Sequence, residues 1–125
     1  MTTLSAGRAI YQKLCNDDSV FSKVTRVFPV VAEEAALPYI AYRRTGMDQA
    51  LVKGLAGADT ATIEVAIFAE SYDESVEIAE SVRASLDGVQ WMVGGLQVRS
   101  CHLTDASESW SDDAYIQNLI FSVKI

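Results

Sequence analysis

His102 and its neighbours have the clearest potential for chemistry. A histidine can activate a serine or cysteine nucleophile, and Asp105 together with nearby serines could complete a hydrolase triad. Cys101 and His102 are adjacent, however, and adjacent residues on a strand point to opposite faces. No nucleophile elbow is present. We therefore expect His102 to lie at a surface or an interface, and we keep a small His102-based hydrolase only as an alternative.

Other motifs for catalysis or cofactor binding are absent from the sequence. Neither Cys15 nor Cys101 has a partner at the spacing typical of structural zinc. The glycine-bearing segment 46–59 lacks the GK[ST] ending of a phosphate-binding loop, and no G-x-G-x-x-G follows a strand. Adjacent carboxylates such as Glu33 and Glu34 diverge on a helix or a strand and do not form an acid and base pair. The sequence predicts no enzyme, no metal and no cofactor.

Length and composition indicate one domain over residues 1–125. A chain of 125 residues with 50% hydrophobic content can bury a core without metals or disulfides. A net charge of −7 argues against sequence-independent binding of duplex DNA, which depends on Lys and Arg. Without a signal peptide or a long apolar run, we expect a soluble protein made in the cytoplasm, with no membrane partner and with both cysteines reduced.

Hydrophobic periodicity predicts two helices. The first covers residues 4–17, with Ala6, Ile10 and Leu14 on one stripe and a polar stop at 16–18. The second covers 71–88, with a capping box at its start and Gly88 at its end. Its predicted buried stripe consists of Val76, Ala79, Val82, Arg83 and Leu86, with Ile78 alongside.

Alternating or β-branched stretches predict the strands. They are 24–30, placed at a sheet edge by Pro29, then 38–44, 60–70, a hairpin over 89–103 turning at Gly94 and Gly95, and 115–125. Residues 104–114 are predicted to be a polar loop.

The order of these elements predicts an α+β fold with two helices packed on a mainly antiparallel sheet. Two helices can cover one face of the sheet. The other face is expected to carry exposed apolar side chains, which a further copy or partner must cover. Depending on the register of the strands, the residues assigned to that face are Ile40, Tyr42, Ala66, Phe68, Ile116 and Ile120.

Two segments are candidate contact sites. Arg43 and Arg44 follow an apolar strand and point to opposite faces, so they are expected at the rim of an interface, with two solvated arginines as the alternative. Segment 46–59 carries Leu51, Val52 and Leu55, which we interpret as a functional arm or an extended hairpin. A loop folded back on its own core is the alternative.

The chain resembles a family of tailed-bacteriophage proteins, the tail-completion or tail-to-head joining family, which includes tail terminators. The resemblance rests on the order and spacing of "VFPV" (27–30), "LPYIAY" (37–42), "IFAESYDE" (67–74), "IAESVRASLDG" (78–88) and "YIQNLIFSVKI" (115–125). It implies a non-enzymatic α+β subunit of a homo-oligomeric ring, typically a hexamer, at the tail-head junction of the virion.

The partners implied by the resemblance are the head connector and the tail-tube proteins. We expect DNA to pass through the ring without specific binding, since an acidic lumen repels it. A cytoplasmic dimeric α+β ligand-binding or regulatory module remains the alternative from another functional class.

Overall fold

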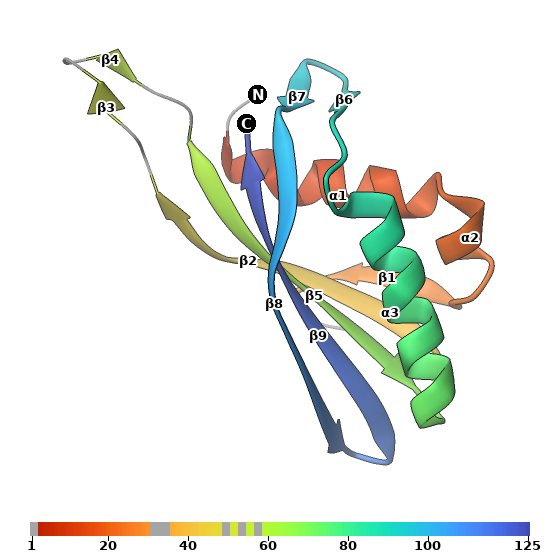
Figure 1. Ribbon diagram of the computed structural model, residues 1–125. Helices are drawn as coiled ribbons and strands as arrows, with labels where there is room; N and C mark the ends of the chain where they lie inside the picture. The colour runs from red at the N-terminus through yellow and green to blue at the C-terminus, as the bar shows by residue number, and fades with distance from the viewer. Residues whose placement is uncertain (1–2, 31–35, 49–50, 53–54, 57–58) are drawn as a thin grey trace.

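A twisted five-stranded sheet forms the centre of the fold in this computed structural model, which describes residues 3–30, 36–48, 51–52, 55–56 and 59–125 (Figure 1). In spatial order its strands are β1 (Arg26–Pro29), β2 (Tyr39–Asp48), β5 (Thr60–Ala69), β9 (Ala114–Lys124) and β8 (Ser100–Ser111). Only β1 and β2 pair in parallel. The predicted α+β fold with a mainly antiparallel sheet is confirmed.

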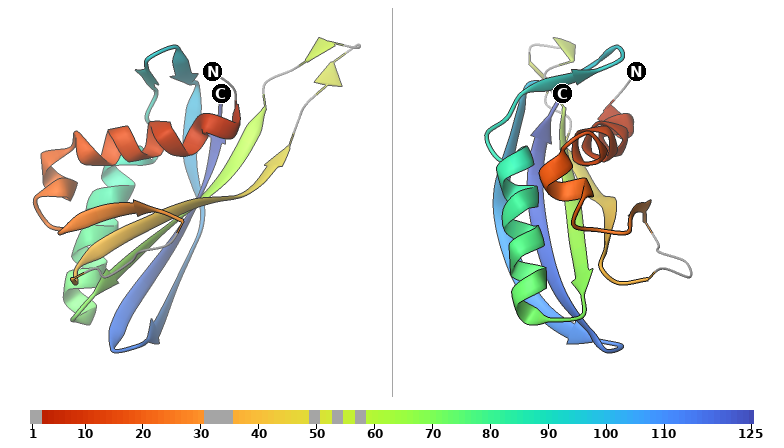
Figure 2. Two further views of the ribbon diagram at one scale, coloured as in Figure 1. Left: turned by 180° about the vertical axis from the view of Figure 1, so that it is seen from behind. Right: turned by 90° about the vertical axis from the view of Figure 1, so that its right-hand side faces the viewer.

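Helices cover one face of this sheet, as the right-hand view of Figure 2 shows. They are the short 3-10 turn η1 (Thr3–Ser5), α1 (Ala6–Cys15), α2 (Asp18–Phe21) and α3 (Tyr72–Leu86). Two small hairpins complete the described chain, β3 (Leu51–Val52) with β4 (Leu55–Ala56), and β6 (Trp91–Val93) with β7 (Leu96–Val98). The second turns at Gly94, whose φ of 59° suits glycine, and this confirms the predicted glycine turn.

Helix α1 packs on the sheet through the predicted stripe, since Ala6, Ile10 and Leu14 are fully buried. Gly7 lies in its first turn against Tyr42 of β2. A Cβ atom at position 7 would lie 3.3 Å from the Tyr42 ring, so glycine permits a close approach of helix and strand there.

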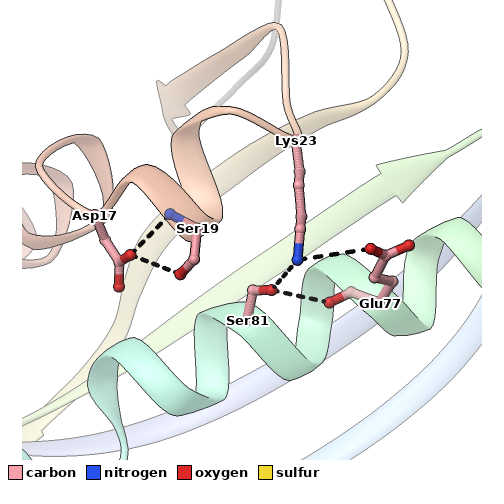
Figure 3. Close-up of polar contacts among 5 residues, drawn as sticks. All are labelled: Asp17, Ser19, Lys23, Glu77 and Ser81. Carbon is pink, nitrogen blue, oxygen red and sulfur yellow. Dashed lines mark hydrogen bonds and ion pairs between the residues drawn. The ribbon is translucent and has the colours of Figure 1, made fainter.

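The short helix α2 was not expected, because residues 16–18 had been interpreted as a polar stop. Asp17 instead caps α2 by accepting hydrogen bonds from the Ser19 amide (3.0 Å) and hydroxyl (2.6 Å) (Figure 3). Beyond α2, Lys23 donates to the Ser81 hydroxyl (2.7 Å) and lies 3.6 Å from a Glu77 carboxylate oxygen on α3. These contacts tie the two helical segments together.

Helix α3 begins and ends as predicted. The Ser71 hydroxyl accepts from the Glu74 amide (3.2 Å), and Gly88 has a φ of 75° just beyond the helix. In the predicted buried stripe, Val76 is only half-buried, and the prediction was wrong at Arg83, which is exposed and pairs with Asp87. Its place in the core is taken by Ser75 and Ser85, residues small enough to fit against the sheet.

Strands β5 and β9 form the centre of the core and follow the predicted alternation. Ile63 pairs with Phe121 and Val65 with Leu119, all four on the helix-covered face. Gln117 lies on the same buried face and donates to the Ser75 hydroxyl (3.3 Å) and to Glu108 (2.9 Å). A buried amide at this position is satisfied by hydrogen bonds.

The assignment of Ile40 and Tyr42 to the open face was wrong. Ile40 is fully buried beneath the helices, and the Tyr42 ring lies 5.9 Å from that of Tyr11 on α1. Tyr39 and Ala41 occupy the open face instead, because Tyr39 pairs with Phe68 and Ala41 with Ala66. The register between β2 and β5 decided this, and the alternation within β2 alone leaves it undetermined.

The prediction of a polar loop at 104–114 was also wrong. Most of this segment belongs to β8, which pairs with β9 along its whole length and has a register shift between Leu103 and Asp105. Asp112 and Asp113, with φ values of 51° and 64°, form the turn between the two strands. The edge strand is exposed along this stretch, so its residues show no apolar alternation.

Asp87 connects the end of α3 to β8. Its Oδ1 accepts from the Leu103 amide (3.0 Å), and its Oδ2 lies 3.3 Å from Nε of Arg83. The bond from Leu103, followed by Arg83, lowers the pKa of Asp87 below its ordinary value of 3.8. The carboxylate therefore stabilises the folded state in its charged form.

We expect Asp87→Ala to lower the free energy of unfolding by about 1 kcal/mol at neutral pH. Since the pKa is lower in the folded state, this contribution is present above the unfolded pKa and is lost as the pH falls through the lowered folded pKa, below 3.8. Urea unfolding of both proteins at neutral and acidic pH should show the difference shrinking, with Glu80→Ala, at an exposed site of α3, as control. If the difference in free energy of unfolding between the wild type and Asp87→Ala stayed constant down to about pH 3, the role of the charged Asp87 carboxylate would be contradicted.

No helix of the described chain is long and apolar enough to cross a membrane.

Candidate assembly surfaces

The open face of the sheet carries an apolar patch at one end. Tyr39 stacks on Phe68, with ring centroids 4.7 Å apart, and Phe28 meets Tyr39 edge-on at 5.9 Å. Ile116 pairs with Phe68 in the register of β5 and β9, and Ile120 lies further along the same face. No helix or strand among the described residues covers this patch (Figure 2). Its side chains are half-buried in the described part of the chain.

The rest of the open face is polar. Thr62 and Glu64 on β5 lie beside Ser122 and Ile120 on β9, and His102 on β8 pairs with Ser122. The expected uncovered apolar face is thus confined to one end of the sheet. An interface across the whole face would bury many polar groups that need hydrogen-bond partners.

Arg43 and Arg44 point to opposite faces, as predicted from their positions on a strand. Arg43 lies on the open face, where its Nη2 is 3.4 Å from a carboxylate oxygen of Glu64. Arg44 lies on the helix side and donates to the Leu4 carbonyl oxygen (2.8 Å). Both side chains are exposed, so these contacts contribute little stability and can be exchanged for others.

The two arginines border a hollow of about 360 Å³. We call it the cationic hollow; its lining residues are Leu4, Gly7, Val30, Tyr42, Arg43 and Arg44. Leu4 and Val30 are 59% and 64% exposed, so the hollow offers apolar surface between its charges. Val30 has a φ of 63°, a strained value for a β-branched residue, and its amide donates to the Tyr42 carbonyl oxygen (2.7 Å). Such strain often marks a functional site.

Within the arm predicted over 46–59, the described residues 51–52 and 55–56 form a two-stranded hairpin. Leu51 pairs with Ala56 and Val52 with Leu55, and β3 and β4 lie away from the helices and the main sheet (Figure 1). The backbone arrangement therefore favours the projecting arm over a loop folded back on the core.

The far end of the hairpin formed by β8 and β9 carries exposed aromatic side chains. Trp110, 59% exposed, pairs with Tyr115 across the two strands, and the Tyr115 ring lies 6.1 Å from that of Tyr72 on α3. Tyr72 donates to a Glu108 carboxylate oxygen (2.9 Å). We call Tyr72, Glu108, Trp110 and Tyr115 the aromatic end. Exposed tryptophan and tyrosine are typical anchors of protein interfaces.

Hydrogen bonds hold Glu108 in place. Its Oε2 accepts from Gln117 Nε2 (2.9 Å) and from the Tyr72 hydroxyl, and these two bonds lower the pKa of Glu108. The carboxylate is thus fixed and charged at neutral pH. Among the described residues, no hydrogen bond reaches its Oε1, which is available to a partner.

His102 and Cys101 point to opposite faces of β8, as predicted. Cys101 is fully buried, and burial raises the pKa of its thiol to about 12, so it remains protonated. His102 is exposed on the polar part of the open face. Cys15 and Cys101 are both free thiols. Among the described residues, no three His, Cys, Asp or Glu side chains are grouped to hold a metal ion.

Sequence reasoning missed the aromatic end, because three separate elements contribute to it. Tyr72 lies at the start of the predicted helix over 71–88. Trp110 lies in segment 104–114, which is predicted to be a polar loop. The available signal was the spacing of Trp110 and Tyr115 around two aspartates, a pattern compatible with a tight hairpin that brings them face to face.

One family of known proteins matches nearly the whole chain. The sequence model of the family described as tail completion protein gp17 matches residues 8–123. Among solved structures, a chain of the "Virion of native gene transfer agent (GTA) particle" has the same fold, with a TM-score of 0.79 and 18% sequence identity. That alignment covers 98% of this chain and 98% of the other. Among the curated proteins, none matches the chain.

Proposed function

This chain belongs to the tail completion protein gp17 family, and from that premise we propose that it completes the tail of a phage or prophage particle and joins it to the head connector. As a member of that family it is a structural phage tail protein located in the virion, and it is not an enzyme. The family assignment favours this role over a cytoplasmic ligand-binding module. We further propose that the chain lies at the tail-head junction of the virion.

We infer that the chain acts as a homo-oligomeric ring, with six copies as the family resemblance implies. The observation that carries this proposal is the apolar patch of half-buried Tyr39, Phe68, Phe28 and Ile116 on a sheet face that no described element covers. Apolar surface left open to solvent commonly marks an interaction site. Neighbouring copies would bury it and gain the corresponding hydrophobic stabilisation.

Ring closure would create two distinct surfaces, one for the tail tube and one for the connector. Arg43 and Arg44 are proposed as contacts at the rim, and Leu51, Val52 and Leu55 of the arm as contacts with a neighbouring copy or the tube. The projection of β3 and β4 beyond the body supports this assignment, since a projecting arm can reach past its own subunit (Figure 1).

DNA would pass through the ring without specific binding. The net charge of −7 and the polar, partly acidic character of the open face support this, because like charges repel phosphates within about 10 Å at moderate salt. A basic lumen in the assembled ring would overturn this part of the proposal.

Deletion of the gene from its phage or prophage should yield filled heads and separate tails in electron micrographs. Supplying the wild-type chain in trans should restore joined particles, because the missing step is assembly and not chemistry. Joined particles at normal yield without the chain would contradict the proposed function.

A further inference from the structure

Two surfaces of this chain carry opposite charge, and both expose apolar side chains. The cationic hollow combines exposed apolar surface with Arg43 and Arg44, and the aromatic end combines exposed aromatic rings with Glu108. Asp112 and Asp113 lie in the turn directly beyond Trp110. The sequence contains no Lys or Arg from residue 100 to residue 123, so this end has no neutralising cation on its own hairpin.

We propose that the aromatic end of one copy docks in the cationic hollow of the next copy. Trp110 enters the hollow against Leu4, Val30 and Tyr42. Arg43 and Arg44 then exchange their exposed contacts for Glu108 and the carboxylates of the turn. The inference rests on the proposed function, because it names a further contact between copies of the chain, beside the burial of the apolar patch.

The size and chemistry of the hollow suit a tryptophan. Its volume of about 360 Å³ is at the small end of ligand pockets, enough for one bulky side chain. Arginine stacks favourably on the face of an indole ring, and its planar group binds carboxylates through two parallel hydrogen bonds. Arg43 and Arg44 can therefore contribute a ring contact as well as ion pairs.

Charge selects this pairing over the symmetric ones. Two aromatic ends facing each other would bring Glu108, Asp112 and Asp113 of both copies together, and two hollows would bring arginines together. Like charges across an interface oppose association. A second copy supplies both required halves without any other protein.

The positions of the two surfaces make the contact heterologous. The hollow lies beside the start of α1, and the aromatic end lies at the turn between β8 and β9, at the other end of the sheet (Figures 1 and 2). After two copies pair, the first keeps an unused hollow and the second keeps an unused aromatic end. Such contacts generate rings when the rotation closes and filaments when it does not.

Two variants separate the halves of the contact. The hollow variant is R43E/R44E, matched by R99E/K124E, which changes the net charge equally at exposed positions outside both surfaces. The aromatic-end variant is W110A/D112N/D113N, in which asparagine tolerates the positive φ of the turn. Its control is M92A, which removes an apolar side chain of similar exposure elsewhere (65%). Thermal unfolding followed by circular dichroism verifies that each variant folds.

Light scattering after size-exclusion chromatography, from about 1 µM to about 1 mM, measures association. We expect the wild type and both controls to form oligomers, and each contact variant alone to associate at least about tenfold more weakly. An equimolar mixture of the two variants retains one intact contact of this kind, so it should associate more strongly than either variant alone.

Three outcomes would overturn the contact: a wild type that stays monomeric over this range, a folded variant that still forms the wild-type oligomer, or a mixture that associates no more strongly than each variant alone. None of them removes the proposed function, which fails only if particles lacking the chain still join heads to tails. The two conclusions are therefore tested separately.

Discussion

Deletion of residues 48–56 is expected to abolish the joining of heads to tails while leaving the fold intact. In the intact chain Met47 pairs with Ala61 across β2 and β5. After the deletion, Met47 would be followed by residues 57–60 and then Ala61. A four-residue connection suits a β-hairpin, so the main sheet can still form. The function is lost because the proposed contact arm is missing.

Infectious particle yield and electron microscopy in a complementation assay measure this result. Yield should fall to that of the gene deletion, and the melting temperature of the purified variant should remain near that of the wild type. A second variant, L51S/V52S/L55S, keeps the length of the arm and removes its proposed contact side chains, so its particle yield should fall as well. Normal yield from the deletion variant would show that the arm has no role in joining.

Phe121→Ala is expected to lower the free energy of unfolding by about 3–5 kcal/mol. Phe121 is fully buried on β9 beneath the helices and pairs with Ile63 on β5. Truncation removes a large apolar contact and leaves a cavity that rigid neighbours fill only in part. A domain of this size has a total stability of about 5–15 kcal/mol, so the variant should approach the limit of folding at 37 °C.

Urea unfolding of the isolated subunit measures this loss, and Ile120→Ala provides the matched comparison. Ile120 is the adjacent residue of the same strand but lies half-buried on the open face. Its truncation should cost only about 1 kcal/mol. If Phe121→Ala and Ile120→Ala lowered the free energy of unfolding equally, Ile120 would be packed as tightly as Phe121. The open face would then not be uncovered in the free subunit.

Local patterns were sufficient for the centre of the fold. The alternation in 60–70 and 115–125, the i, i+4 stripe of Ala6, Ile10 and Leu14, and the glycine at position 88 each depend on residues close in sequence. A strand or helix buried on one face must repeat its apolar residues with the period of its own backbone. These predictions were confirmed because the spacing of the apolar residues in the sequence matches the period of the strand or helix that they form.

Candidate contact residues were only partly accessible from the sequence. The divergence of Arg43 and Arg44 follows from strand geometry, and the projecting arm follows from its length and composition. The partners of the two arginines, Glu64 and the Leu4 carbonyl, are distant in sequence, so only the folded chain brings them together. The roles of Leu51, Val52 and Leu55 stay predictions.

The tertiary structure alone decided which face each strand presents and where its edges lie. Ile40 and Tyr42 faced the helices because β2 pairs with β5 in one register, and a shift by one residue would have reversed them. Residues 104–111 became a strand because β9 offers a free edge, although their exposed, polar side chains carry no periodic signal. Backbone pairing needs no particular side chain, so a solvent-exposed edge strand and the aromatic end it builds appear only once the partner strand is in place.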